Sequence, residues 1–341
     1  MGIVYMVGRT NAATAAESAV LRGRGLTVHQ VPLSRLPMYD DGDFYHAHAT
    51  WRDMLLTMAY CRITGKRFYG DYNDIINASA NGHATGEAAY YEQDIWTRDL
   101  SDIDRERLDI IAAMIPPDTT SILDAGCGNG KVSDHLTAYG YAVTGLDMST
   151  AALKQVSSPA IRASVTRIPA RDWSFDAVVS TELLEHLPPA DYSKAIEELA
   201  RIARNAIVLE LPNAQQLSHG TERCSRCGAR FHANHHYRNF YGHNTYSLPR
   251  FSGFHLADIR YSTSPQFRYN PVLLRIRQRL AGVYMKSPIA YCTACGTRQF
   301  ATGLREYSAI YRSCAGMEKR LRKHRTNHWP SQVFLLYRRQ T

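Results

Sequence analysis

An acidic residue and three glycines at alternate positions form the part of this chain best suited to bind a ligand. Asp124 ends a short apolar run, and the glycines follow it before a helix-compatible segment begins at Lys131. Glycines in such a turn let the backbone approach a ligand closely, and free N–H groups at a helix start attract negative groups. A second apolar run, 142–146, ends in Asp147, and an acid at that place can accept hydrogen bonds from ribose hydroxyls. The three glycines are Gly126, Gly128 and Gly130.

The spacing of the glycines separates this turn from a dinucleotide-binding turn, which is the obvious competitor. That fingerprint reads G-x-G-x-x-G, whereas this chain reads G-x-G-x-G with an acid two residues before the first glycine. Further along, a predicted strand at 175–180 is followed by the polar and acidic stretch that begins at Thr181. Together these features resemble the class I methyltransferases that use S-adenosylmethionine (SAM). The resemblance covers residues 85–213 and continues more loosely to the C-terminus, and a relative of the fold without its ligand is the remaining interpretation.

The resemblance implies SAM as the cofactor and assigns its parts to residues of this chain. The glycine loop, with Asp124 before it and Cys127 inside it, is expected to cradle the methionine part. Asp147 is expected to hold the ribose, and Met148 beside it to pack near the adenine. The third strand lacks the acid usual in the family, so further adenine contacts are expected a few residues past it. The expected cofactor residues are Asp124, Gly126, Cys127, Gly128, Gly130, Asp147, Met148, Ser164, Val165, Thr181 and Glu182.

The resemblance also implies a seven-stranded, mostly parallel, doubly wound sheet of the α/β class. Its last two strands are expected to form the antiparallel pair that marks the family. Asp124 and Asp147 then lie at the carboxyl ends of neighbouring strands, where ligands bind in open α/β sheets. Strands fit the sequence at 121–124, 142–146, 160–164, 175–180, 205–210, 256–261 and 332–338.

Three regions are predicted along the chain, with the methyltransferase domain at 120–341. Residues 1–76 alternate short apolar runs with helix-like segments, which indicates a small, partly Rossmann-like α/β region. The stretch 43–72 is similar to part of the N-terminal domain of two-Rossmann-domain glycosyltransferases, although the donor-sugar half has no visible counterpart. Residues 77–119 are predicted to be a linker followed by helices that cover the cofactor.

Two matching Cys-x-x-Cys-Gly stretches predict a metal site in an insertion at about 214–300. Two such pairs make the four-thiolate, tetrahedral zinc site whose role is structural. The 64 residues between the pairs exceed the usual spacing, so the loop between them must contain folded structure. One of the histidines at 232, 235, 236 and 243 could replace a cysteine, or two could form a second site. The predicted ligands are Cys224, Cys227, Cys292 and Cys295.

The same insertion bears on the substrate. From the first cysteine pair through His235 and His236 to Gly253-Phe254, it is similar to a zinc-bearing insertion in methyltransferases of surface-glycan and natural-product gene clusters. That resemblance implies methyl transfer to a hydroxyl or amine of a small molecule or glycan precursor. The acceptor must lose a proton, and His186 is the predicted base because it follows the fourth strand by six residues. His235 and His236 are the alternatives for that role.

Composition narrows the class of protein and leaves two other functions open. The chain has 341 residues, no apolar run long enough to span a membrane and no signal-peptide pattern, which predicts a cytoplasmic protein. Its formal net charge is +9, and the basic residues gather after Arg260, which predicts an anionic partner. An RNA methyltransferase would use these charges and the zinc knuckles on phosphates. A non-catalytic scaffold could instead lie on anionic lipid through a basic amphipathic helix at 271–285. The residues do not indicate the oligomeric state.

Overall fold

The computed structural model describes most of the chain from residue 90 onward and two short strands before it. The described residues are 3–7, 27–31, 90–93, 100–244, 247–266, 269–280, 289–298, 309–323 and 329–340. Strands β1 (Ile3–Val7) and β2 (Thr27–Val31) pair in parallel. The other elements predicted before residue 77 and the linker at 77–89 lie outside the described residues, so the N-terminal α/β region stays a prediction.

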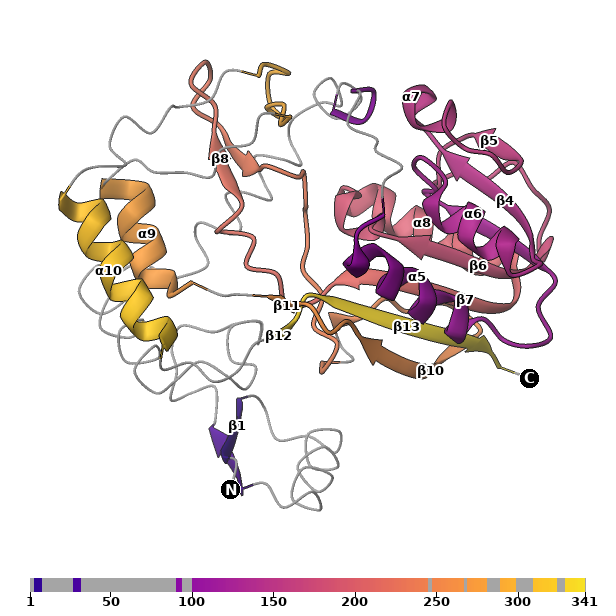
Figure 1. Cartoon of the computed structure of the whole chain (residues 1–341), viewed down its shortest axis with the longest axis horizontal. Helices are drawn as coiled ribbons and strands as arrows, with labels where there is room; N and C mark the ends of the chain where they lie inside the picture. The colour runs from indigo at the N-terminus through magenta and orange to yellow at the C-terminus, as the bar shows by residue number, and fades with distance from the viewer. Residues whose placement is uncertain are drawn as a thin grey trace.

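A seven-stranded sheet forms the framework of the described chain, in the order β10-β13-β7-β6-β3-β4-β5 (Figure 1). Neighbouring strands are parallel except at β13, which runs antiparallel to both β7 and β10. This confirms the mostly parallel sheet with an antiparallel pair that the sequence predicted. The strands are β3 (Ser121–Ala125), β4 (Ala142–Asp147), β5 (Ala160–Arg162), β6 (Phe175–Thr181), β7 (Ala203–Pro212), β10 (Phe254–Tyr261) and β13 (Gln332–Arg339).

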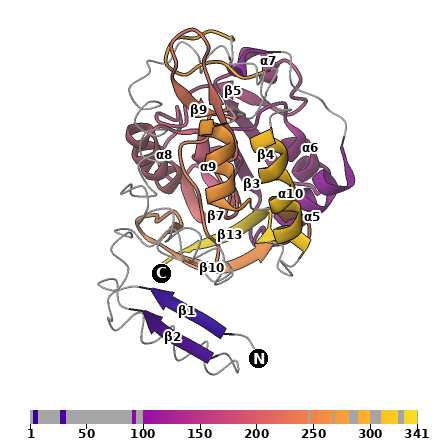
Figure 2. The same ribbon diagram turned by 90° about the vertical axis from the view of Figure 1, so that its left-hand side faces the viewer.

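Alternate side chains of the central strands enter two separate cores, one on each face of the sheet. Leu123 belongs to one core and its neighbour Ile122 to the other. The strands read as nearly unbroken apolar runs because neither of their faces meets water. Helix α8 (Pro189–Ile202) packs on the first core, and helices α5 (Asp102–Met114) and α6 (Lys131–Ala138) pack on the second. Figure 2 shows α8 on one side of the sheet and the other two helices on the opposite side.

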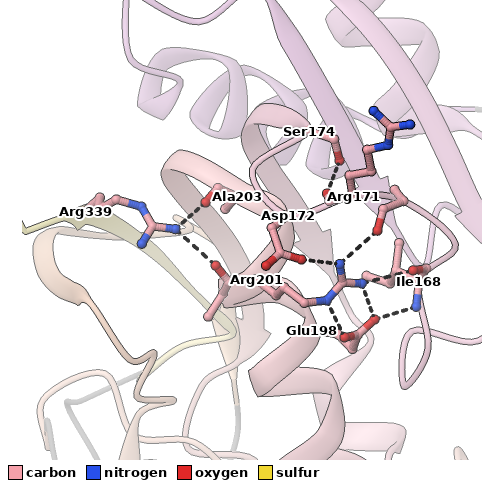
Figure 3. Close-up of polar contacts among 10 residues, drawn as sticks. Ile168, Arg171, Asp172, Ser174, Glu198, Arg201, Ala203 and Arg339 are labelled. Atoms are coloured by element: carbon pink, nitrogen blue, oxygen red, sulfur yellow. Dashed lines mark hydrogen bonds and ion pairs between the residues drawn. The ribbon is translucent and has the colours of Figure 1, made fainter.

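Polar contacts of α8 fix both the loop after β5 and the end of the helix (Figure 3). The Glu198 carboxylate accepts the Ile168 N–H at 2.7 Å, and Arg201 donates to the Ile168 carbonyl at 3.0 Å. Arg339 of β13 donates to two carbonyls at the C-terminal end of α8, at 3.2 and 2.6 Å. A cation at that end also opposes the negative pole of the helix dipole. The loop 163–170 is thereby held against the helix.

The C-terminal half of the chain also forms short strands and two helices outside the seven-stranded sheet. Strands β8 (Thr221–Arg223) and β9 (Arg230–His232) follow β7 in the chain and pair antiparallel with each other. Helices α9 (Pro271–Leu280) and α10 (Ala309–Lys323) follow β10 in the chain and pack against each other, at the left in Figure 1. The sequence correctly required folded structure between the cysteine pairs, since β10 and α9 both lie there.

The basic amphipathic helix predicted at 271–285 is described up to Leu280. Its apolar side chains Leu273 and Leu274 are 5% and 4% exposed, so they pack inside the protein and do not face a lipid surface. Among the described residues, no helix combines the length and apolar character that crossing a membrane requires.

Asp176, near the start of β6, ties that strand to the beginning of β3. Its Oδ2 accepts hydrogen bonds from the hydroxyl and N–H groups of Thr120 and Ser121, at 2.6 to 3.1 Å. Its Oδ1 accepts a hydrogen bond from Arg204 at 2.6 Å. These bonds, above all that of the Thr120 hydroxyl, hold the pKa of the Asp176 carboxyl well below its usual value. The ionised carboxylate therefore stabilises the folded state.

We expect Asp176→Asn to lower the free energy of unfolding by about 2–3 kcal/mol at pH 7, because charged hydrogen bonds are lost. A depressed pKa stabilises the fold above the ordinary Asp pKa of about 4, and this contribution is lost as the pH falls. The difference in the free energy of unfolding between wild type and variant should therefore become smaller below about pH 4. Urea unfolding at several pH values measures it, and Asp118→Asn, at a half-exposed acid, is the control. If this difference in the free energy of unfolding stays constant down to pH 3, the ionised Asp176 carboxylate does not stabilise the fold as described.

Candidate cofactor and metal sites

The glycine loop follows β3 at the edge of the sheet where the parallel strands end. Its three glycines have φ values of +80°, +53° and +84°, a backbone region that favours glycine over other residues. The N–H groups of Gly126 and Cys127 both donate to the Leu146 carbonyl, at 2.7 and 3.0 Å, and bind the loop to β4. These two amides are therefore used by β4, and the free N–H groups expected at the start of helix α6 stay a prediction. What the loop offers a ligand is close approach of its backbone.

Asp147 lies directly after β4 and bridges two loops. One carboxylate oxygen accepts the Gly128 N–H at 2.9 Å, and the other accepts the Ser149 N–H at 2.8 Å. Burial raises the pKa of Asp147, and the two backbone hydrogen bonds oppose that rise. Each carboxylate oxygen has a further lone pair, so the side chain can still accept hydrogen bonds from a ligand. This is the place and the chemistry predicted for the ribose contact.

Asp124 is fully buried at the end of β3. Its Oδ2 accepts a hydrogen bond from the Ser133 hydroxyl at 2.6 Å, whereas Oδ1 has no hydrogen-bond partner among the described residues. Burial raises the pKa of Asp124 to about 7. A buried acid with an unused oxygen is suited to balance a positive group, such as the ammonium of a methionine moiety.

The residues predicted near the adenine lie after β4 and β5, side by side. Met148 is 64% exposed, an unusual state for a large apolar side chain and one that leaves it available to a flat ligand. Val165 is buried, and the Ser164 and Thr166 hydroxyls bond to each other at 2.8 Å. Arg162 of β5 donates to the Met148 carbonyl at 3.2 Å, which joins the two loops.

Residues 90–93 attach to the loop after Asp147. The Ser149 hydroxyl donates to the Tyr91 carbonyl at 2.8 Å. The Glu92 carboxylate accepts the N–H groups of Thr150 and Ala151, at 2.8 and 3.1 Å, at the start of helix α7 (Thr150–Leu153). These contacts fit the prediction that segments before residue 119 cover the cofactor. Sequence reasoning missed Ser149 and Glu92, although a Ser-Thr pair before a short helix is a capping signal.

Buried acids crowd the loop after β6. Thr181 ends the strand, and Glu182 follows with a φ of +48°. Burial, and then the charge of Glu210, raises the pKa of Glu182 to about 7. Glu185 is fully buried and its pKa is raised well above the usual value, first by burial and then by Glu182. Arg107 pairs with Glu210, so one of these three acids has a cation beside it.

His186 lies in the short 3-10 helix η2 (Leu184–His186), and its side chain is 15% exposed. Its ring contacts the His236 ring at a centroid distance of 4.5 Å, with the planes perpendicular. Burial, and then the charge of His235, lowers the pKa of His186 to about 3. The ring is therefore neutral near pH 7 and a weak base. Its predicted role as general base stays a prediction.

The four predicted cysteine ligands come together. The Cys224 and Cys295 sulfurs are 3.7 Å apart, and the Cys227 and Cys292 sulfurs are 3.6 Å apart. All four sulfurs lie within 4.8 Å of one another. A disulfide needs about 2.05 Å, whereas thiolates around one tetrahedral zinc ion lie about 3.8 Å apart. The arrangement suits a bound ion and not a pair of disulfides.

The two cysteine pairs have the same backbone geometry, although they lie far apart in the chain. Gly228 donates its N–H to the Cys224 carbonyl at 3.0 Å, and Gly296 does the same to Cys292 at 2.8 Å. Each first cysteine also donates its own N–H to the carbonyl five residues later, at 2.9 and 2.8 Å. Both pairs thus form the tight turn that aims two sulfurs at a common point. The histidines considered as alternative ligands are not in this cluster, which contains cysteines alone.

The comparisons with known proteins match the part of the chain that holds the candidate cofactor residues. Residues 123–207 match a family described as a methyltransferase domain. The ubiquinone biosynthesis O-methyltransferase of Paracidovorax citrulli is 32% identical over 118 residues, which are 31% of this chain and 49% of that protein. The protein of the same name from Albidiferax ferrireducens is 34% identical over 116 residues, 30% of this chain and 46% of its own. The chain spans about half the length of these curated relatives.

Among solved structures, magnesium protoporphyrin IX methyltransferase from Synechocystis PCC 6803 with bound SAM is 14% identical. The similarity covers 56% of this chain and 90% of that chain, with a TM-score of 0.34. The seven-stranded sheet and its helices fit the class I methyltransferase α/β fold. The matched family segment includes the glycine loop, Asp147 and His186, and it ends before the cysteine cluster.

The contact between β4 and the glycine loop depends on a glycine that the sequence did not single out. A Cβ at Gly145 would lie 2.8 Å from the Cys127 sulfur. We expect Gly145→Ala to lower the free energy of unfolding by about 1–3 kcal/mol, because the sulfur must move. Adding Cys127→Ala should recover part of that loss, as measured by urea unfolding.

The control for this pair is Gly316→Ala in α10, where an added Cβ meets nothing within 4 Å. That variant should be as stable as wild type or more stable by up to about 1 kcal/mol. If Gly145→Ala proved as stable as wild type, or if removing the sulfur recovered nothing, the steric account would be wrong.

Proposed function

We propose that this protein is a SAM-dependent methyltransferase acting on a hydroxyl or amine of a small molecule or glycan precursor. The observation that carries the proposal is the bridge from Asp147 to Gly128 N–H and Ser149 N–H, beside a glycine loop at the carboxyl edge of the sheet. This bridge lies inside the segment that matches methyltransferase domains. Ligands of open α/β sheets bind at that edge.

Each part of the cofactor has a partner of suitable chemistry. Asp147 would accept the ribose hydroxyls, and the unused oxygen of Asp124 would face the cofactor's positive methionine end. Met148, exposed after β4, would cover one side of the adenine together with the loop that carries Ser164 and Val165. Residues 90–93 would lie over the bound cofactor, since Tyr91 accepts a hydrogen bond from Ser149 and Glu92 accepts one from Thr150, both in the segment after β4.

Methyl transfer from a sulfonium is an in-line displacement, in which the cofactor supplies the methyl group and the leaving group. The protein's share is mainly to align the acceptor with the methyl carbon. Such alignment can contribute roughly 7–11 kcal/mol when two bound groups react as one molecule. A small acceptor and an oxygen nucleophile are supported by the relatives, which are named ubiquinone biosynthesis O-methyltransferases. A glycan acceptor is supported by the insertion that follows β7.

SAM binding tests the proposal directly. We expect wild type to bind SAM in calorimetry and Asp147→Ala to bind it about 10–100 times more weakly, because hydrogen bonds to a charged group are lost. Asp109→Ala, at an exposed acid of α5, is the matched control and should bind like wild type. Thermal unfolding of both variants shows whether the fold is kept. Wild-type protein that binds no SAM, or an Asp147→Ala variant with unchanged affinity, would contradict the proposal.

We also infer that the four cysteines hold a structural zinc ion. The donor set is entirely thiolate, the sulfur separations match one tetrahedral ion, and four protein ligands leave no position for water. Such an ion would hold together two segments, around 221–232 and 289–298, that lie far apart in the chain. The ion would stabilise the folded insertion and would take no part in the methyl transfer itself.

Metal content tests this inference. We expect one zinc ion per chain to survive dialysis against a chelator in wild type, and Cys224→Ser or Cys292→Ser to lose it. Each variant should also unfold at least about 5 °C lower, because the ion binds only the folded insertion. Cys314→Ser, a buried cysteine of α10 outside the cluster, is the control and should keep its zinc. Wild type without metal, or a Cys224→Ser variant that retains it, overturns the inference.

A further inference from the structure

A groove runs along α8 at the edge of the sheet opposite the candidate cofactor residues. Those residues lie where the parallel strands end, whereas the groove lies where β6 and β7 begin and where the antiparallel β13 ends. Trp173, just before β6, and Arg339, at the end of β13, both line it. Its volume is about 790 Å³, which is in the range of sites that hold one small molecule.

Trp173 presents an aromatic ring at this groove from a strained backbone position. Its side chain is 56% exposed, and its φ of +56° lies in the left-handed region, which a bulky residue rarely adopts. Its N–H donates to the Arg201 carbonyl at 2.9 Å, which holds the residue in this conformation. Strain of this kind is concentrated at ligand sites. The ring is therefore placed to stack on a flat ligand.

Two arginines bring positive charge to the same groove. The Arg339 guanidinium carbon lies 5.6 Å from the centroid of the Trp173 ring. Its hydrogen bonds run from Nε and Nη2 to backbone carbonyls, and none of them uses Nη1. Arg339 therefore has no acidic partner among the described residues. Arg250 is exposed and also lines the groove. Guanidinium groups match phosphate better than any other side chain does.

The remaining lining residues favour an anionic ligand with an apolar body. Glu197 is the one acid among the described residues that line the groove, against three arginines. This balance of charge attracts an anion. The apolar part of the wall comes from α8 and from the segment before β10, and includes Tyr192, Ile196 and Leu248.

We propose that this groove is a second binding site, for a ligand that carries a flat aromatic ring and a phosphate group, as a mononucleotide does. Trp173 stacks on the ring, and Arg250 and Arg339 bind the phosphate through charged hydrogen bonds. A ring without a phosphate, or a phosphate without a ring, uses only half of the site.

Arg201 connects the groove to the loop that is expected to contact the adenine, so the ligand acts on cofactor binding. This consequence rests on the proposed binding of SAM. Arg201 donates to the carbonyls of Ile168 and Ala170, at 3.0 and 2.8 Å, and so holds the loop 163–170 (Figure 3). Its own carbonyl accepts the Trp173 N–H. A ligand that displaces Trp173 or Arg201 therefore displaces this loop, and the affinity for SAM changes with it.

Nucleotide binding tests the proposal. Calorimetry compares guanosine and uridine 5′-monophosphates, whose bases differ from the adenine of SAM, with their nucleosides and with ribose 5-phosphate. We expect wild type to bind at least one of the two nucleotides with a Kd below about 1 mM, and the nucleosides and ribose 5-phosphate at least about tenfold more weakly. Wild type that binds neither nucleotide, or that binds a nucleoside as tightly as its monophosphate, overturns the proposal.

Variants at the groove identify where the nucleotide binds. Trp173→Ala and Arg250→Ala should each weaken its binding at least about tenfold, whereas Trp173→Phe, which keeps a ring, should retain most of it. The matched controls are Tyr139→Ala, at an aromatic residue that is 60% exposed, and Arg105→Ala on α5. Both controls should bind the nucleotide like wild type, and thermal unfolding shows whether each variant keeps its fold. If both alanine variants at the groove bind like wild type, the groove is not the site.

Two further measurements separate this site from the candidate cofactor site. Asp147→Ala should bind the nucleotide like wild type, because Asp147 lies at the other edge of the sheet. If it does not, the nucleotide occupies the cofactor site and the proposal is wrong. Saturating nucleotide should change the Kd for SAM at least about threefold, and an unchanged Kd overturns the connection through Arg201. Wild type that binds a nucleotide but no SAM contradicts the methyltransferase proposal alone, and SAM without a nucleotide contradicts the groove alone.

Discussion

The side-by-side ends of β3 and β4 are the constraint on which the candidate site depends. Parallel pairing brings the glycine loop against the Leu146 carbonyl, which accepts two of its N–H groups. The Asp147 carboxylate then joins the two loops, because it accepts one hydrogen bond from an N–H of the glycine loop and one from an N–H of its own loop. Three left-handed glycines allow the chain to turn in the space available, and Gly145 leaves room for the Cys127 sulfur. If the two strands separated, no cofactor residue would keep its place.

The cysteine cluster acts on this site from a distance, through backbone contacts. The second cysteine pair belongs to the segment 289–298, whose Tyr291 carbonyl bonds to His235 at 2.8 Å. The Ile289 carbonyl of the same segment accepts a hydrogen bond from the Gln93 side chain at 2.8 Å. The His235 ring stacks on Tyr90 at 4.4 Å, and residues 90–93 bind the loop after Asp147. An ion that fixes the segment 289–298 would therefore also help to hold residues 90–93 against the loop after Asp147.

Local patterns in the sequence predicted the sheet, the glycine loop and the cysteine cluster, because each depends on short-range spacing. Buried strands appear as apolar runs, and a cysteine pair followed by glycine specifies its own turn. The contact between the His186 and His236 rings could not be read in this way, since it depends on how the segment after β9 folds back on the sheet. Gln93 and Gln215 were missed for the same reason, as each bonds to a distant segment. The bonds from the Gly126 and Cys127 N–H groups to the Leu146 carbonyl could not be predicted either, because cross-strand bonds leave no local pattern in the sequence.

The acids of the candidate cofactor site fit the charge of the proposed cofactor and its change during the reaction. SAM brings a positive sulfonium, and the surrounding side chains include Asp124, Asp147 and Glu182, whose pKa values are all raised by burial. A bound cation would favour the ionised form of these acids, so a positive ligand and the ionised carboxylates would stabilise each other. Transfer of the methyl group removes the sulfonium charge. The proposed product would then be held less tightly by the same acids, which would favour its release.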